Sequence, residues 1–173
     1  MNGTLDLAAG FHARLAVDRA AGELRDGAIR YLMMRPDALM GLFARLAPEH
    51  RAPALEALAA SVAEHGGRSA AAYRDSGAAD PEAMMQVIAA TSADLGWGVW
   101  SFARQGPRRI EVTVANSPFA AGIGRAGAPV CAPVRGMLAA IGPLLLGCDR
   151  AEVAETRCRA VTGEGPCRFA VTG

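Results

Sequence analysis

All four cysteines of the chain lie in its last third, and three of them fall in the runs PVCAPVRG, ETRCR and GEGPCRF. A glutamate precedes the second of these by three residues, so Cys131, Glu155, Cys158 and Cys167 form one candidate set of metal ligands. Thiolate and carboxylate groups both suit a tetrahedral zinc ion. Four protein ligands would leave no open coordination position, so the predicted zinc is structural. The sequence therefore predicts a small domain stabilised by metal.

This set requires a particular backbone. Glu155 and Cys158 fall on one predicted strand, where residues three apart point to opposite faces, so a bulge between them is expected. Glycines at 163 and 165 would form the turn that returns Cys167 to Cys158. Nearby arginines could offset the negative charge of the ligands, namely Arg135, Arg157, Arg159 and Arg168.

Two other interpretations of the cysteines remain open. The thiols could be inert core residues, because free cysteine is often buried, or they could have a redox or disulfide role. Cys148 follows a glycine at a predicted helix end, and we expect it to be a small apolar residue and not a ligand.

Composition excludes several function classes. The 173 residues suit one domain with a short arm, and an apolar content of 51% is enough for a core. The net charge of +1 gives no reason to expect nucleic acid or an anionic membrane as a partner. All 18 basic residues are arginine, which excludes a lysine Schiff base and a Walker lysine. No signal peptide is evident and the apolar run 137–147 is too short to span a bilayer, so we expect a cytoplasmic protein with reduced thiols.

The order of elements predicts an α+β fold, with helices in the N-terminal half packed on a short antiparallel sheet. Residues 1–27 are expected to be an arm with one helix near 13–24, and residues 28–173 the main domain. Within that domain we expect a strand at 30–34, helices at 37–47, 51–75 (loosened at Gly66-Gly67) and 80–95, and a hairpin at 96–115. A loop at 116–129, a helix at 129–147 and two closing strands complete it.

The motif P-V-C…G…G…E-T-x-C-R…G…C-R-F, from Pro129 to Phe169, resembles the 4-vinyl-reductase domain family. This domain occurs in a bacteriochlorophyll-biosynthesis protein, in archaeal hydrocarbon-binding proteins and in sensor domains of phenol-responsive bacterial activators. It is distantly related to small subunits of vesicle-tethering complexes. The run RYLMMRPDALMGLFARL is similar to the start of the sensor domains, so the resemblance spans about residues 28–172. It implies a dimerising α/β fold in which the four predicted ligands bind structural zinc.

The chain also departs from the phenol sensors. Those domains use a histidine before the hairpin and a tryptophan on its second strand to hold the phenol hydroxyl. Here the segment before the hairpin, ATSADLG, has no histidine, and the second-strand position corresponds to Val114. The resemblance therefore implies a ligand site without implying phenol as its ligand.

Aromatic and thioether side chains are the candidates for an adaptable apolar pocket, although such residues are more often core. Polar contacts could be added by a tyrosine or a histidine. The predicted ligand-binding residues are Trp97, Trp100, Phe102, Tyr31, Met84 and His65.

A Gly-rich run, GIGRAG at 122–127, matches G-x-G-x-x-G, but its spacing from the strand and the position of Asp149 do not suit a dinucleotide site. We expect it to be a flexible lid. The sequence favours a zinc-stabilised sensor or carrier domain for a hydrophobic or aromatic molecule, acting as a homodimer, over an enzyme. The alternatives are a protein of tetrapyrrole metabolism and a protein-interaction module.

Overall fold

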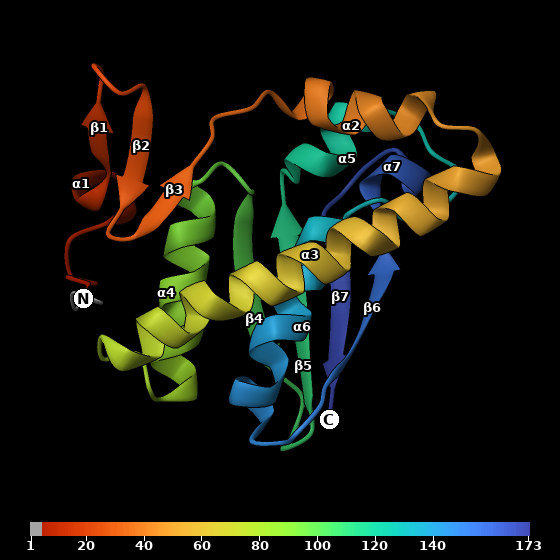
Figure 1. The fold of residues 1–173 in the computed structure, drawn as a ribbon. Coiled ribbons are helices and arrows are strands. Elements are labelled where there is room, and N and C mark those ends of the chain that lie inside the picture. The colour runs from red at the N-terminus through yellow and green to blue at the C-terminus, as the bar shows by residue number, and fades with distance from the viewer. Residues whose placement is uncertain (1–4) are drawn as a thin grey trace.

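A computed structural model describes residues 5–173, and its centre is a four-stranded antiparallel sheet (Figure 1). The strands are β4 (Val99–Arg104), β5 (Arg109–Ala115), β6 (Glu152–Arg157) and β7 (Cys167–Thr172), in the order β4-β5-β7-β6. On β5 and β7 alternate side chains are fully or almost fully buried, with Val112 opposite Phe169 and Val114 opposite Cys167. Alternation on two neighbouring strands gives the sheet one apolar face.

Helices cover this face in two layers (Figure 1). α4 (Pro81–Asp94) and α6 (Ala132–Leu146) lie on the sheet, and the long α3 (Pro48–Asp75) crosses over α6. The crossing is close because a Cβ atom at Gly136 would collide with the carbonyl oxygen of Ala59, and one at Gly66 would lie 2.9 Å from the Met137 methyl. The predicted loosening at Gly66-Gly67 is wrong, since α3 is continuous there. Gly66 instead serves close helix packing.

Three short elements lie together at one end of the sheet, at the top of Figure 1: α2 (Pro36–Arg45), α5 (Pro118–Ile123) and α7 (Arg159–Thr162). The segment of α5 was expected to be part of a loop, but Pro118 stands at the first turn of a helix, where proline is well tolerated. A Cβ atom at Gly122 would lie 2.5 Å from the Pro36 carbonyl oxygen, so this glycine allows α5 to pack against α2.

The GIGRAG run therefore ends α5 and continues into the following loop. Every strand pairing in the central sheet is antiparallel, so the parallel β–α–β unit of a dinucleotide site is not formed there.

Residues 5–31 form a separate small layer, the N-terminal module. It contains α1 (Phe11–Arg14) and a three-stranded sheet of β1 (Ala16–Asp18), β2 (Glu23–Asp26) and β3 (Ile29–Tyr31). The predicted helix at 13–24 is wrong, because Gly22 at φ 67° and Gly27 at φ 59° turn the chain into consecutive hairpins. The expected boundary after residue 27 falls inside the β2–β3 turn.

A buried ion pair holds this module together. Arg14 Nη2 lies 3.0 Å from Asp26 Oδ2, with side-chain exposures of 8% and 2%. Tyr31 is adjacent, and burial, together with Tyr73 of α3 and the charge of Asp26, raises the pKa of its hydroxyl. The module is thus linked to the helical layer through buried polar groups.

The mixed α+β class predicted from the sequence is confirmed, as are the 96–115 hairpin and the two closing strands, whereas the helix predicted at 129–147 begins later, at Ala132, and leaves Cys131 just before it. Within residues 5–173, no helix has both the length and the apolar character needed to cross a membrane.

Candidate metal centre and ligand cavity

Four side chains from separate elements converge at the end of the sheet near α7. Cys131 immediately precedes α6, Glu155 lies on β6, Cys158 immediately precedes α7, and Cys167 begins β7. Their ligand atoms all lie within 4.8 Å of one another. We call this set the Cys₃Glu cluster. Its three thiols are at least 98% buried, so it is part of the protein interior.

Local backbone irregularities produce this convergence. The β6–β7 register shifts between Glu155 and Arg157, which is the irregularity that the three-residue spacing predicted. After α7 the chain turns through Gly163 and Gly165, both at positive φ (87° and 70°), and this turn brings Cys167 back beside Cys158.

The geometry fits a tetrahedral ion. The sulfur atoms of Cys131 and Cys167 are 3.6 Å apart, close to the separation of about 3.8 Å that two zinc–sulfur bonds of about 2.3 Å subtend in a tetrahedron. Glu155 Oε2 accepts a hydrogen bond of 3.0 Å from the Cys131 amide, whereas its Oε1 is buried with no partner among the described residues. An unpartnered buried carboxylate oxygen is costly unless a cation binds it.

The protonation of the cluster leads to the same conclusion. Burial, with a hydrogen bond and charge interaction from Cys158, raises the pKa of Glu155 to about 8. Hydrogen bonds with Cys158 and Cys167, together with burial, raise the pKa of Cys131. Four adjacent acidic groups cannot all be anionic without a compensating charge, and a divalent cation would supply it.

Backbone and hydroxyl groups surround the sulfur atoms. The Arg159 amide donates to Cys167 Sγ at 3.3 Å, and the buried Ser117 hydroxyl lies 3.3 Å from Cys131 Sγ. In the described part of the chain, no guanidinium group is hydrogen-bonded to a ligand of the Cys₃Glu cluster. This holds for the four arginines that were expected to offset its charge: Arg135, Arg157, Arg159 and Arg168. Cys148 lies outside the cluster, with its sulfur 2.9 Å from the Arg150 carbonyl oxygen.

A separate cavity of about 440 Å³ lies between the N-terminal module and the helical body. Two of the predicted ligand-binding residues, Tyr31 and Trp97, line it. Trp97 packs edge-on against Phe119 of α5, with ring centroids 5.2 Å apart, and Phe11 packs against Tyr31 at 5.0 Å. Apolar side chains form most of the remaining wall: Leu24, Met33, Met34, Leu39, Leu58 and Val62. We call this space the aromatic cavity.

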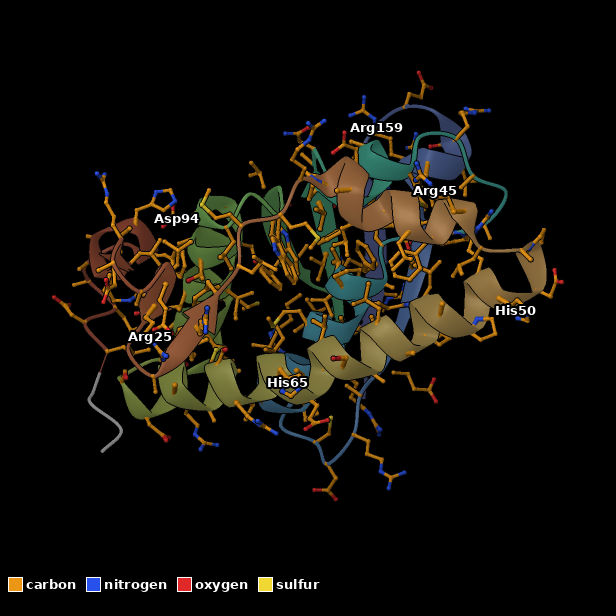
Figure 2. The ribbon with its side chains drawn as sticks, turned by 45° about the horizontal axis from the view of Figure 1, so that its top comes forward. Arg25, Arg45, His50, His65, Asp94 and Arg159 are labelled. Atoms are coloured by element: carbon orange, nitrogen blue, oxygen red, sulfur yellow. The ribbon has the colours of Figure 1, made fainter. Side chains whose placement is uncertain are left out.

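The other predicted ligand-binding residues lie elsewhere. Trp100 is buried, with its indole N–H donating to the Trp97 carbonyl at 3.2 Å, and Phe102 is half-buried beside it. Met84 is 2% exposed in the core. His65 is exposed on α3, as Figure 2 shows. Of the six residues, the structure brings only Tyr31 and Trp97 to the aromatic cavity.

Sequence reasoning also missed wall residues of the cavity. Phe119 was assigned to a loop, and Phe11 and His12 to the arm. Asp94, at the end of α4, joins the two parts: its carboxylate accepts from the Phe11 amide at 3.0 Å, and its carbonyl oxygen lies 2.8 Å from His12 Nε2. Figure 2 shows Asp94 beside α1. Nothing in the sequence indicated that Asp94, at the C-terminal end of a predicted helix, would bind a segment that lies so far away along the chain.

The fold and the Cys₃Glu cluster define a small mixed α/β domain with a buried candidate metal centre. Residues 110–172, which include all four cluster residues, match the family model of the 4-vinyl-reductase domain. This match confirms the resemblance to that family drawn from the motifs.

Solved structures share the fold. The phenol-responsive sensory domain of the transcription activator PoxR, crystallised with phenol, aligns at a TM-score of 0.77 with 18% identity, covering 96% of this chain and 87% of that one. Subunit 3 of a trafficking protein particle complex from Naegleria fowleri, covalently bound to palmitic acid, aligns at 0.55 with 10% identity, covering 79% and 93%. No curated protein matches the sequence.

Proposed function

We propose that this chain is a ligand-binding domain of the sensor or carrier type that holds a small hydrophobic or aromatic molecule in the aromatic cavity. The observation that carries the proposal is the cavity itself, whose volume of about 440 Å³ and walls of aromatic, aliphatic and thioether side chains suit such a ligand. The sensory domain of PoxR, which has the same fold, was crystallised with phenol.

The polar groups of the cavity would orient the ligand. Tyr31, His12 and Asp94 line it, and the last two are already joined by a hydrogen bond. Tyr31 is a neutral donor at physiological pH, as an ordinary tyrosine is, and burial raises its pKa further. A ligand with one hydroxyl or carbonyl group on an apolar skeleton matches this combination.

The second part of the proposal is a structural zinc ion bound by Cys131, Glu155, Cys158 and Cys167. The separation of the Cys131 and Cys167 sulfur atoms and the unpartnered Glu155 Oε1 support it. The ion would link the start of α6 to the closing strands and would stabilise the end of the sheet.

Native mass spectrometry of the purified protein, followed by thermal unfolding with phenol and with naphthalene, tests the ligand proposal. We expect a co-purified organic mass or a rise in Tm with one of these probes. Val62→Phe, which fills the cavity, should abolish the effect. Ala60→Phe, on an exposed position of the same helix, should preserve it. No bound mass and no Tm change with either probe, or an unchanged response in Val62→Phe, would reject the proposal.

A different feature, an exposed apolar segment, supports a homodimer and a protein-interaction role. Leu32, Met33 and Met34, in the connector between the N-terminal module and α2, are 77%, 81% and 53% exposed. Exposed adjacent apolar side chains favour contact with another protein surface, and we propose a second copy of the chain. Light scattering of the wild type and of Met33→Ser tests this, since a monomeric wild type would contradict it.

We also propose a cytoplasmic location, where the four free thiols would stay reduced. A role in tetrapyrrole metabolism remains the alternative, supported by the family resemblance alone. A pigment that co-purifies with the protein and absorbs visible light would favour it over the sensor or carrier role.

A further inference from the structure

A second and larger cavity, of about 640 Å³, lies beside the start of α3 and shares no lining residue with the aromatic cavity. Its walls are the first half of α3, the loop at 126–130, the start of α6 and the edge strand β6. We call it the α3–β6 groove. Neither the family match nor the Cys₃Glu cluster accounts for it, although Glu155 forms part of its wall.

Small side chains create the space. The wall positions include Ala52 on α3, Gly127 and Ala128 in the loop, and Ala154 on β6. A Cβ atom at Gly127 would meet nothing within 4 Å. Leu55 and Val153 add larger apolar surface, so most of the wall is hydrophobic. A cavity of this size is large enough for a small organic molecule.

Two guanidinium groups interrupt this apolar wall. Arg51 is held in place by three hydrogen bonds to the carbonyl oxygens that end α2: its Nε donates to Phe43 at 2.9 Å, and its Nη2 donates to Ala44 at 3.1 Å and to Leu46 at 3.2 Å. Among the described residues its Nη1 has no partner and no carboxylate pairs with it. Arg51 is therefore a pre-positioned cation with donor capacity left over.

The second guanidinium belongs to Arg135, in the first turn of α6. Its Nη2 lies 2.6 Å from Oε1 of Glu56, and the Arg135 side chain is 26% exposed whereas that of Glu56 is 64% exposed. An ion pair with one partner so exposed contributes little and exchanges readily with a competing anion. Arg51 and Arg135 both line the α3–β6 groove, so one small molecule bound there could contact both cations.

We propose that the α3–β6 groove is a second binding site, specific for an amphipathic organic anion. The apolar body of the ligand would lie against Ala52, Leu55 and Val153, and its carboxylate or sulfonate would bind Arg51 and Arg135. Arginine suits such groups because its planar fork can donate two parallel hydrogen bonds. A neutral molecule of the same shape would leave the two cations without a new partner.

A pair of fluorescent probes with one skeleton tests the charge requirement. 8-Anilinonaphthalene-1-sulfonate is anionic, and N-phenyl-1-naphthylamine is the same aromatic skeleton without the sulfonate. We expect the anionic probe to bind the wild type, with affinity about tenfold lower in Arg51→Gln and about fivefold lower in Arg135→Gln. Arg135→Lys should recover part of that loss. Neither arginine substitution should change binding of the neutral probe.

Two further substitutions locate the probe. Ala52→Phe fills the groove and should weaken binding of the anionic probe at least tenfold, on the order of the loss in Arg51→Gln. Ala57→Phe, at an exposed position of α3 that lines neither cavity, should leave it close to the wild-type value. Far-UV circular dichroism and Tm of each variant confirm that it is folded.

Glu56→Gln gives a prediction of opposite sign. Removing this carboxylate releases Arg135 and removes a repulsive charge, so affinity for the anionic probe should rise by about threefold. If these residues had only a structural role, Glu56→Gln would not increase the affinity for the anionic probe.

Three results would overturn the proposal. The first is no binding of the anionic probe at millimolar concentration. The second is unchanged binding in Ala52→Phe, and the third is equal loss of both probes in the arginine variants. These outcomes are independent of the aromatic cavity, because Val62→Phe should leave binding in the groove intact.

Discussion

Arg14 and Asp26 form an ion pair that is almost completely withdrawn from solvent, at 3.0 Å between Nη2 and Oδ2. Arg14 Nε also donates to both carboxylate oxygens, and its Nη1 donates to the Ala9 carbonyl at 2.7 Å. The pair joins α1 to β2 in a module too small to have a large core of its own. Its integrity therefore determines whether that module keeps its shape.

Asp26→Asn should lower the free energy of unfolding by about 3 kcal/mol, because it leaves the Arg14 charge buried without a partner. Urea denaturation measures the loss. Glu64→Gln, which breaks an exposed pair with Arg68, is the control and should cost less than about 0.5 kcal/mol. Equal losses in the two variants would show that the buried pair has no special role.

Gly136→Ala should destabilise the protein by about 1–3 kcal/mol, because the added methyl group overlaps the Ala59 carbonyl and forces α3 and α6 apart. Gly127→Ala is the matched control, since its methyl group would meet open space. Thermal or urea unfolding of both variants checks this prediction. If Gly136→Ala is as stable as the control, the helices are not in contact as described.

Cys158→Ser should abolish stoichiometric metal binding and lower Tm, because one thiolate ligand is lost from a site with no spare donor. Metal analysis by inductively coupled plasma mass spectrometry and a thermal melt provide the readouts. Cys148→Ser should retain full metal content, as this residue lies outside the cluster. A strong chelator should lower the Tm of the wild type to that of Cys158→Ser. Unchanged metal content in Cys158→Ser would exclude the proposed centre.

Metal affinity should rise with pH, and the rise should become less steep above about pH 8. Binding requires Glu155 to be ionised, and its pKa in the metal-free cluster is about 8, so a proton must leave as the ion enters. Cys131, whose pKa is also raised, adds to this requirement. Each proton released gives an increase in affinity of about tenfold per pH unit, and the Glu155 contribution ends above about pH 8. Competition with a zinc indicator at several pH values measures the slope, and a flat profile would contradict the prediction.

The C-terminal half of the fold could be predicted because its patterns are local and unambiguous. Alternation of apolar and polar residues predicted β5 and β7. The three-residue spacing of Glu155 and Cys158 required an irregularity in the strand, and the structure has a register shift between Glu155 and Arg157. The cluster was predictable because cysteine and glutamate at fixed positions of a motif allow few other arrangements.

The N-terminal residues were harder to predict. The run from 13 to 24 has a helical period, but pairing between β1 and β2 and the turn at Gly22 outweigh helical propensity. The aromatic cavity was only partly predictable, because its walls come from segments that are widely separated along the chain. Burial of Trp100 and exposure of His65 depend on how the strands and helices pack together, and composition alone does not determine this.

The aromatic cavity lies where two separately packed parts of the chain meet, and the exposed connector at 32–35 is the covalent link between them. A molecule bound there would touch both parts and would link them without a covalent bond. Ligand binding should therefore slow local opening of the N-terminal module. Hydrogen exchange of the backbone amides of β1, β2 and β3 would then slow on ligand binding, which would make the module a reporter of occupancy.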